Sequence, residues 1–325
     1  MEPIENQTKM IVYDITNSVV NDYKNNLIKS MWNAEEATSF SQMDKDLQQI
    51  TTQLNEQERQ FLIRIHLYFL LGDSCVVMVG YGTILRRITH SSIHAHECIK
   101  IGNEVVHAET YVRIIDFIAP NEKEEFLKNG HKHPYVMNKI AWTKKYALDD
   151  ENMPLGKVFL SMIITELLFF SASFASIFWF RNTKEILYGI SAANELIFRD
   201  ESQHGECYIY IYNHLIINKL QESEVHDMIR DAVEVECAFV DEIAPQSIGM
   251  NAVLLNDYVM YIADTILTSL HYNKIYHKQN PFNFMATVSL SRRTDNFRKN
   301  PTDYRRVENK IFDFKEISDD EMYLI

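Results

Sequence analysis

The sequence predicts an all-α protein. Glycine (9) and proline (7) are scarce among 325 residues, which does not suit the many turns of a β-sandwich or barrel. Aromatic residues are plentiful, and the chain is long enough to bury a large core. The formal net charge is −13 without a basic block of any length, so nucleic acid is not expected as a partner.

Apolar runs of helical character recur along the chain. The first opens at Asn55, where NEQE has a cap residue followed by Glu at the third helical position. Pro120 ends the second, Pro154 lies in the first turn of the third, and Asn182 with Glu185 repeats the cap pattern before the fourth. The expected helices cover about 55–85, 91–118, 154–180, 182–215, 222–240 and 247–272.

The chain divides into an expected helical domain, residues 1–290, and a C-terminal tail, residues 291–325. After Leu290 the composition changes to SRRTDNFRKNPTDYRRVENK and then to acidic EISDDEMYLI, without an apolar stripe, which predicts a mobile tail. The N-terminal MEPIENQTKM has no apolar region typical of a signal peptide, so a cytoplasmic location is expected. The cysteines, which form no CxxC pair, are expected to be reduced and buried: Cys75, Cys98, Cys207 and Cys237.

The stretch SMIITELLFFSASFASIFWF, residues 161–180, has the length and apolarity of a membrane span. Glu166 lies in its first half, however, and a carboxylate inside a bilayer is costly. No other segment resembles a span, so we expect a central helix covered by protein and no membrane partner. A buried carboxylate also needs a cation or a proton, which raises the question of what faces Glu166.

Two Glu-x-x-His units supply an answer. Glu104 with His107, and Glu201 with His204, are each three residues apart and so share one helix face. Asp73 adds a single acid in LLGDSCVV, and Glu166 adds another in TELLFF. Two helices with one carboxylate each and two with Glu-x-x-His match the ligand pattern of di-iron and di-manganese helical bundles. This pattern predicts a site for two divalent metals with positions open to oxygen.

Another group of polar residues is not expected to bind metal. His90, His94, His96, Glu97 and Cys98 lie close in sequence among other polar residues. We interpret this group as a helix start or an exposed face.

Six motifs resemble the small subunit of class I ribonucleotide reductase, from about residue 30 to the C-terminus. They are MWNAEE (31–36), LLGDS (70–74), NEVVHAETY (103–111), TELLFFSASFASIFW (165–179), NELIFRDESQH (194–204) and NPFNFM (280–285). The resemblance implies a ferritin-like helical bundle with two iron ions, or manganese, activated by oxygen. The implied metal ligands are Asp73, Glu104, His107, Glu166, Glu201 and His204.

The resemblance also implies a radical site. Tyr111, four residues after His107, matches the tyrosine that holds the stable radical. The residues that match the apolar pocket around it are Phe170, Phe174 and Ile197. Such a pocket is needed because a phenoxyl radical survives only where water and reductants are excluded.

Radical transfer is the last implied feature. Trp32 and Asp200 match residues that connect His107 to the protein surface through hydrogen bonds. Tyr304, in the tail, matches the tyrosine that passes the radical to the large catalytic subunit. The resemblance implies a homodimer, with the C-terminal DDEMYLI docking on that large subunit.

The hypothesis from the sequence is therefore the radical-generating small subunit of ribonucleoside-diphosphate reductase. Two alternatives stay open at this point. A di-iron oxidase or hydroxylase with a small apolar substrate would need neither Tyr111, Trp32 nor Tyr304. A ferritin-like iron-handling protein would need an iron exit route, and the long tail does not suit a cage.

Overall fold

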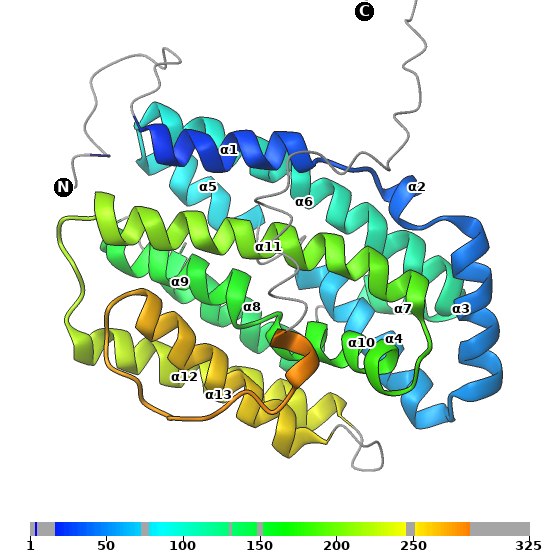
Figure 1. The fold of residues 1–325 in the computed structure, drawn as a ribbon. Helices are drawn as coiled ribbons and strands as arrows, with labels where there is room; N and C mark the ends of the chain where they lie inside the picture. The colour runs from blue at the N-terminus through cyan, green and yellow to red at the C-terminus, as the bar shows by residue number, and fades with distance from the viewer. Residues whose placement is uncertain are drawn as a thin grey trace, which may run out of the picture. The chain divides into compact units, whose positions relative to one another are not determined.

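The computed structural model describes residues 4, 17–72, 78–129, 132–147, 152–244 and 251–286. No strand occurs in these ranges, and the prediction of an all-α fold is confirmed. Residues Met1–Ala286 form one compact unit (Figure 1). The expected tail, 291–325, lies outside the described residues, so its predicted role stays a prediction.

Helices α1 to α13 form this unit. In chain order they are α1 (Ser18–Ser30), α2 (Ala34–Ala37), α3 (Phe40–Gln53), α4 (Glu56–Gly72), α5 (Met78–Arg87), α6 (Ser91–Ile118), α7 (Pro120–Asn129), α8 (Pro134–Ala147), α9 (Leu155–Leu167), α10 (Ser171–Thr183), α11 (Tyr188–Leu215), α12 (Glu222–Ile243) and α13 (Ala252–Ser269).

The start of α4 agrees with the sequence prediction, because its cap is formed by residues close in sequence. The N–H of Glu58 donates to Oδ1 of Asn55 (3.0 Å), and the N–H of Asn55 donates to the Glu58 carboxylate (3.1 Å). This reciprocal cap opens α4 as expected. Helices α1–α3, α7 and α8 were not predicted. The expected run 55–85 is described as α4 and α5, with residues 73–77 between them outside the described ranges.

The single helix expected at 154–180 is wrong, because α9 ends at Leu167 and α10 begins at Ser171. The N–H of Phe169 donates to the carbonyl of Ile164 (3.1 Å), one residue further back than in an α-helix. The carbonyl of Phe169 accepts hydrogen bonds from Nζ of Lys139 (2.9 Å) and the hydroxyl of Tyr68 (3.3 Å). Side chains from α8 and α4 thus satisfy a backbone group that the break leaves without its helical partner.

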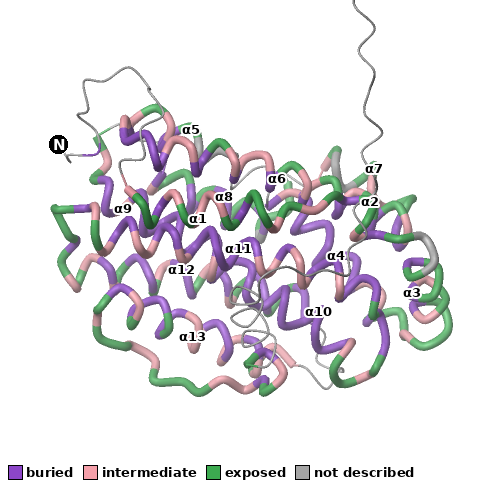
Figure 2. Tube along the Cα trace, turned by 45° about the horizontal axis from the view of Figure 1, so that its top comes forward, coloured by how far each residue is buried: buried purple, intermediate pink, exposed green. Residues whose placement is uncertain are grey.

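The helical segment Leu155–Thr183 is long and apolar enough to cross a membrane by length and composition alone. However, 94% of its most apolar window is buried inside the protein. This burial agrees with the expected role as a core segment, and Figure 2 shows buried residues concentrated along α10 and α11.

The start of α11 also differs from the prediction. Asn182 still belongs to α10, where its side chain donates to a carbonyl of that helix, and Glu185 has a positive φ of 58°. Helix α11 begins at Tyr188, and the N–H of Ile190 donates to Oδ2 of Asp46 (2.6 Å). The cap therefore comes from α3, a helix distant in sequence.

Helix packing brings the predicted ligand helices together. Helix α11 packs on α9 and α6, while α6 also packs on α1 and α4 (Figure 1). Gly205 of α11 faces Leu167 of α9, and a Cβ at Gly205 would lie only 2.4 Å from Cδ2 of Leu167. The absent side chain thus permits the close approach of α9 and α11, which carry Glu166, Glu201 and His204.

Candidate metal centre

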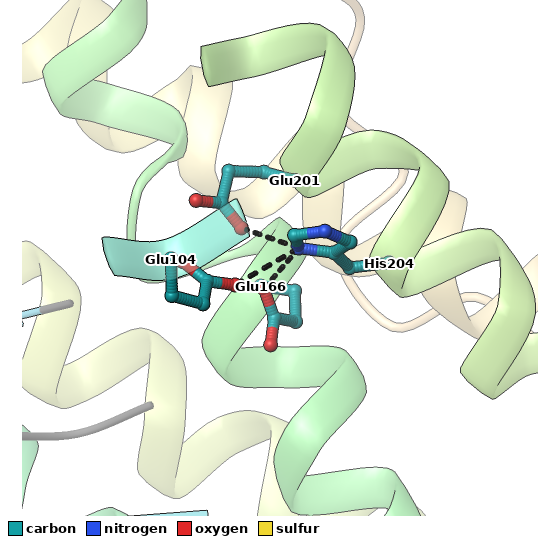
Figure 3. A group of neighbouring side chains, drawn as sticks. All are labelled: Glu104, Glu166, Glu201 and His204. Carbon is teal, nitrogen blue, oxygen red and sulfur yellow. Dashed lines mark hydrogen bonds and ion pairs between the residues drawn. The ribbon is translucent and has the colours of Figure 1, made fainter. Parts of the chain in front are cut away.

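Three helices bring four metal-ligating side chains to one point. Glu104 comes from α6, Glu166 from α9, and Glu201 with His204 from α11. One ligand atom of each lies within 4.8 Å of those of the others, and all four side chains are buried (Figure 3). The Glu-x-x-His spacing therefore does place carboxylate and imidazole on one face, as expected.

Two of the carboxylates lie between the two imidazoles. Nδ1 of His204 is 3.0 Å from Oε1 of Glu104 and 3.2 Å from Oε2 of Glu201. Nδ1 of His107 is 3.1 Å from the other oxygen of Glu104 and 2.9 Å from the other oxygen of Glu201. Each carboxylate thus directs one oxygen to each histidine. This arrangement suits two neighbouring cations bridged by carboxylates.

The charges of this cluster depend on one another. Burial would raise the pKa of Glu104, but His204 and His107 hold it well below its usual value. Burial and Glu104 would likewise raise the pKa of Glu201, which His107 and hydrogen bonds hold at about 2. Burial would lower the pKa values of both histidines, yet the carboxylates raise them well above normal. The cluster thus holds carboxylates that need cations.

Glu166 has the least compensated carboxylate. Burial raises its pKa to about 8, Lys100 opposes this rise, and Glu201 adds to it. Among the described residues, Oε2 of Glu166 has no hydrogen-bond donor, and its ion-pair contact with Nδ1 of His204 is 3.7 Å long. A buried carboxylate oxygen without a donor is unfavourable, whereas it is a good ligand for a divalent first-row metal. The residues present therefore fit a metal site.

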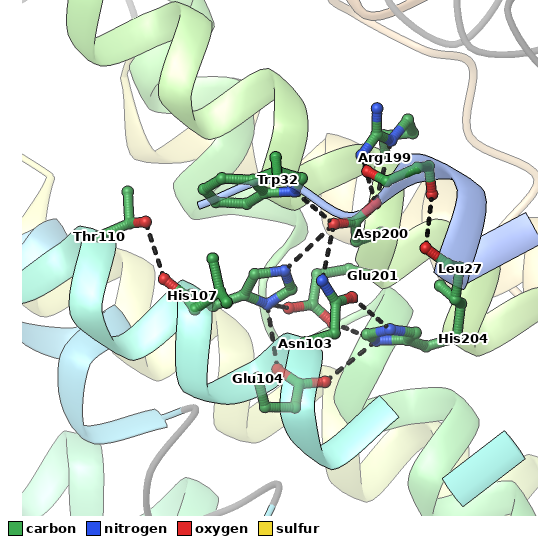
Figure 4. A network of polar contacts seen from close by, with 12 residues as sticks. Leu27, Trp32, Asn103, Glu104, His107, Thr110, Arg199, Asp200, Glu201 and His204 are labelled. Carbon is green, nitrogen blue, oxygen red and sulfur yellow. Dashed lines mark hydrogen bonds and ion pairs between the residues drawn. The ribbon is translucent and has the colours of Figure 1, made fainter. Parts of the chain in front are cut away.

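Outer hydrogen bonds orient both imidazoles. Nε2 of His204 is 3.0 Å from Oδ1 of Asn103, and Nε2 of His107 is 3.5 Å from Oδ2 of Asp200 (Figure 4). Both Nε2 atoms face acceptors, so each imidazole would keep its proton there on binding a metal, and each Nδ1 would lose its proton and face the metal.

Asp200 is the centre of a polar network. Its Oδ2 accepts hydrogen bonds from Nε1 of Trp32 (2.7 Å) and Nδ2 of Asn103 (3.0 Å), while Oδ1 accepts one from Nε of Arg199 (2.9 Å). Burial would raise the pKa of Asp200, but its hydrogen bond with His107 and the charge of Arg199 bring it to about 2. The ring of Trp32 also stacks on His107, with centroids 5.8 Å apart. The predicted connection of Trp32, Asp200 and His107 is present as a set of contacts.

Tyr111 lies in an aromatic pocket. Its buried ring stacks on Phe69, with centroids 4.8 Å and planes 5° apart. Phe69 in turn contacts Phe170 and Phe174, at centroid distances of 5.6 Å and 4.8 Å. His66 meets Tyr111 edge-on at 6.3 Å. The predicted pocket residues therefore reach Tyr111 through Phe69, and the third of them, Ile197, is fully buried as well.

Two predicted site residues lie outside the described residues, namely Asp73 and Tyr304. Four residues beside the metal cluster or Tyr111 were not predicted from the sequence: Phe69, His66, Asn103 and Lys100. Phe69 had a local signal, because it lies four residues before Asp73, and the helix expected over 55–85 would place both on one face.

The interpretation of residues 90–98 as an exposed face is wrong. His96 and Glu97 are fully buried, and Nδ1 of His96 is 3.0 Å from Oε1 of Glu97. Nδ1 of His96 and Oε1 of Glu97 therefore satisfy each other without solvent, whereas Nε2 of His96 has no hydrogen-bond partner among the described residues. The expected helix start is present, because α6 begins at Ser91.

The cysteine prediction holds only in part. Among the described cysteines, Cys98, Cys207 and Cys237 are free. Cys207 is buried as expected, whereas Cys237 is only half-buried. Cys98 is exposed, so its predicted burial is wrong, since it lies on the outer face of α6. Cys75 lies outside the described residues.

A family model and a related sequence both match this chain over most of its length. The family model of the ribonucleotide reductase small chain matches residues 9–281. The chain is 34% identical over 301 residues to the ribonucleoside-diphosphate reductase small chain of Plasmodium falciparum (isolate Dd2), with 92% of this chain and 84% of that protein covered.

Two solved structures are similar in fold. The ribonucleotide reductase Rnr4 homodimer from Saccharomyces cerevisiae gives a TM-score of 0.74 at 19% identity, with 91% of this chain and 92% of that one covered. The dimanganese(II) NrdF of Streptococcus sanguinis gives a TM-score of 0.73 at 17% identity, with 84% of this chain and 95% of that one covered. At these identities the structures show the fold alone.

The helical bundle and its buried carboxylate and imidazole cluster define a ferritin-like carboxylate protein. The sequence comparisons narrow this class to one family. The chain belongs to the ribonucleotide reductase small-chain family, as its motifs predicted. Its function is that of the radical-generating small subunit of ribonucleoside-diphosphate reductase, an oxidoreductase that makes DNA precursors. The alternatives of a hydroxylase and an iron-handling protein are thereby set aside.

Proposed function

We propose that this subunit holds two iron ions and carries its stable radical on Tyr111. The proposed ligands are Asp73, Glu104, His107, Glu166, Glu201 and His204. The observation that carries the proposal is the placement of Glu104 and Glu201, each with one oxygen toward either histidine. Manganese is the second candidate, because the same ligand types accept it.

When bound, the metal pair and oxygen would supply the oxidation of Tyr111 by one electron. The phenol gives up that electron together with its hydroxyl proton and becomes a neutral phenoxyl radical. The stacked ring of Phe69 and the apolar side chains of Phe170, Phe174 and Ile197 would keep water and reductants away. The close packing around Tyr111 supports this role.

Radical transfer would leave the site through His107, Asp200 and Trp32. The 2.7 Å hydrogen bond from Trp32 to Asp200 and the stacking of Trp32 on His107 support this route. Trp32 is only half-buried, so the route approaches the surface of the helical unit. Tyr304 would continue the route in the tail.

The proposed assembly is a homodimer that works with a separate large subunit in the cytoplasm. Support for the homodimer comes from the Saccharomyces cerevisiae structure, which is described as one. The tail residues Met322, Tyr323, Leu324 and Ile325 would enter an apolar groove of the large subunit, with Asp319, Asp320 and Glu321 facing a basic rim.

Electron paramagnetic resonance tests the radical assignment. After loading with ferrous iron and exposure to oxygen, the wild type should give a tyrosyl radical signal. Tyr111→Phe should give none while it retains its metal, because the ring still packs but has no hydroxyl. Tyr212→Phe is the matched control, since Tyr212 is also buried but bonds to Tyr272 (2.8 Å). An unchanged signal in Tyr111→Phe would refute the assignment.

A further inference from the structure

A buried lysine lies directly beside the metal cluster. Lys100 is on α6, one turn before Glu104, and its side chain is fully buried. Its Nζ donates a hydrogen bond to Oε1 of Glu166 and another, 3.0 Å long, to the hydroxyl of Tyr208. A buried ammonium group is costly unless it is paired and hydrogen-bonded. The acceptors on α9 and α11 therefore determine where this charge lies.

Lys100 is also held by a carboxylate that is not a proposed metal ligand. The hydroxyl of Tyr208 donates to Oε2 of Glu97 (2.8 Å), and Oε1 of Glu97 is 3.0 Å from Nδ1 of His96. Glu97 is fully buried, and Lys100 contributes to holding its pKa below the usual value. Movement of Lys100 away from this place would leave the buried charge of Glu97 with only the contacts of His96 and Tyr208. The lysine is thus anchored independently of Glu166.

The two oxygens of Glu166 have different neighbours. Oε1 accepts the hydrogen bond of Lys100, whereas Oε2 faces Nδ1 of His204 within the cluster. Glu104 and Glu201 differ from Glu166 in this respect, because both of their oxygens face imidazoles. The ammonium group occupies one lone pair of Oε1 and its positive charge repels a second cation, so Oε1 is a weaker metal ligand than Oε2.

We propose that Lys100 is a positioning residue of the metal centre, which holds Oε1 of Glu166 and limits this carboxylate to one metal-facing oxygen, Oε2. The role rests on the proposed function, because it requires Glu166 to be a ligand. A carboxylate that binds through one oxygen occupies one coordination position where a bidentate one occupies two. Lys100 thereby keeps a position open at the metal nearest Glu166, where a small molecule can bind.

Crystal structures of the protein loaded with Mn²⁺ test this role without reference to turnover. In the wild type, Nζ of Lys100 should remain hydrogen-bonded to Oε1 of Glu166, with only Oε2 on the metal. Lys100→Gln keeps a donor and should retain the one-oxygen mode. Lys100→Met removes the donor and should lose the one-oxygen mode, because both oxygens of Glu166 can then turn to the metal.

Lys139→Met is the matched control, because Lys139 is also a fully buried lysine paired with a buried glutamate, Glu236 (2.5 Å). This variant should keep the one-oxygen mode, since Tyr68 remains as a donor to the carbonyl of Phe169. In solution, infrared difference spectra on Mn²⁺ binding report the same change. The splitting between the two carboxylate stretches narrows when both oxygens bind one metal.

The outcomes separate this role from the proposed function. Two results would overturn the role of Lys100 alone. One is a metal-loaded wild type in which Lys100 is not bonded to Glu166, and the other is a Lys100→Met structure in which Glu166 still binds through one oxygen. Absence of metal from the wild-type cluster would overturn both. If Lys100→Met does not fold, the wild-type structure and Lys100→Gln still decide, because two oxygens of Glu166 on one metal in either would refute the role.

Discussion

Gly205→Ala is expected to separate the two helices that carry the metal cluster. The added Cβ would lie 2.4 Å from Cδ2 and 2.5 Å from Cγ of Leu167, whereas ordinary contact begins at 3.4 Å. The shortfall of 1.0 Å (3.4 − 2.4) must be met by movement of Leu167 or of α9. Leu167 is adjacent to Glu166, so this movement should also change the position of a proposed ligand.

The expected magnitude follows from two opposing effects. Alanine is favoured over glycine inside a helix by about 0.5–1 kcal/mol, and overpacking costs about 1–3 kcal/mol. Gly82→Ala in α5 isolates the first effect, because nothing lies within 4 Å of a Cβ at that position. Gly82→Ala should therefore be slightly stabilising, and Gly205→Ala should be less stable than it by about 1–3 kcal/mol.

Urea unfolding of the metal-free proteins measures the unfolding free energies of Gly205→Ala and Gly82→Ala. Titration with Mn²⁺ measures the metal affinity of each variant. Metal affinity should fall in Gly205→Ala but stay unchanged in Gly82→Ala. The double variant Leu167→Ala/Gly205→Ala should regain part of the stability, because the colliding branch is gone. Equal unfolding free energies for Gly205→Ala and Gly82→Ala would refute the steric reasoning.

Three further predictions concern burial, capping and the tail. Burial lowers the pKa of His66 to about 4 from 6.5, so the unfolded chain takes up the proton first as the pH falls, and stability is lost between pH 6.5 and 4. This loss of unfolding free energy, about 3 kcal/mol, should be absent from His66→Phe. Urea titrations across that pH range measure it, and unfolding free energies of wild type and His66→Phe that fall in parallel with pH would contradict the prediction. Asn55→Ala removes the cap of α4 and should cost about 1 kcal/mol of unfolding free energy, while an unchanged urea midpoint would count against the cap. Tyr304→Phe should still bind a matched large subunit but stop nucleotide reduction, and substantial turnover would exclude Tyr304 from the relay.

Local spacing in the sequence was sufficient to predict that each Glu-x-x-His unit places its carboxylate and imidazole side by side. Glu104 with His107, and Glu201 with His204, share a helix face because three residues make nearly one turn, whatever the surrounding fold. The cap at Asn55 was predictable for the same reason, since its partner is three residues away. Scarce glycine and proline with long apolar runs indicated the helical class.

Contacts between residues distant in sequence were decided only by the tertiary structure. The break between α9 and α10 is stabilised by Lys139 and Tyr68, and α11 is capped by Asp46 from α3. No local sequence pattern predicts these contacts, because the partner residues lie on other helices.

The pairing of Lys100 with Glu166 spans 66 residues and depends on how α6, α9 and α11 pack. In the sequence, Lys100 is an ordinary charged residue that would be expected at the surface. Its burial beside Glu97 and Glu166 is stable only because the folded bundle brings these opposite charges together away from water. The sequence alone therefore determined which side chains can bind metal, and the packing of the helices decided which charges accompany them.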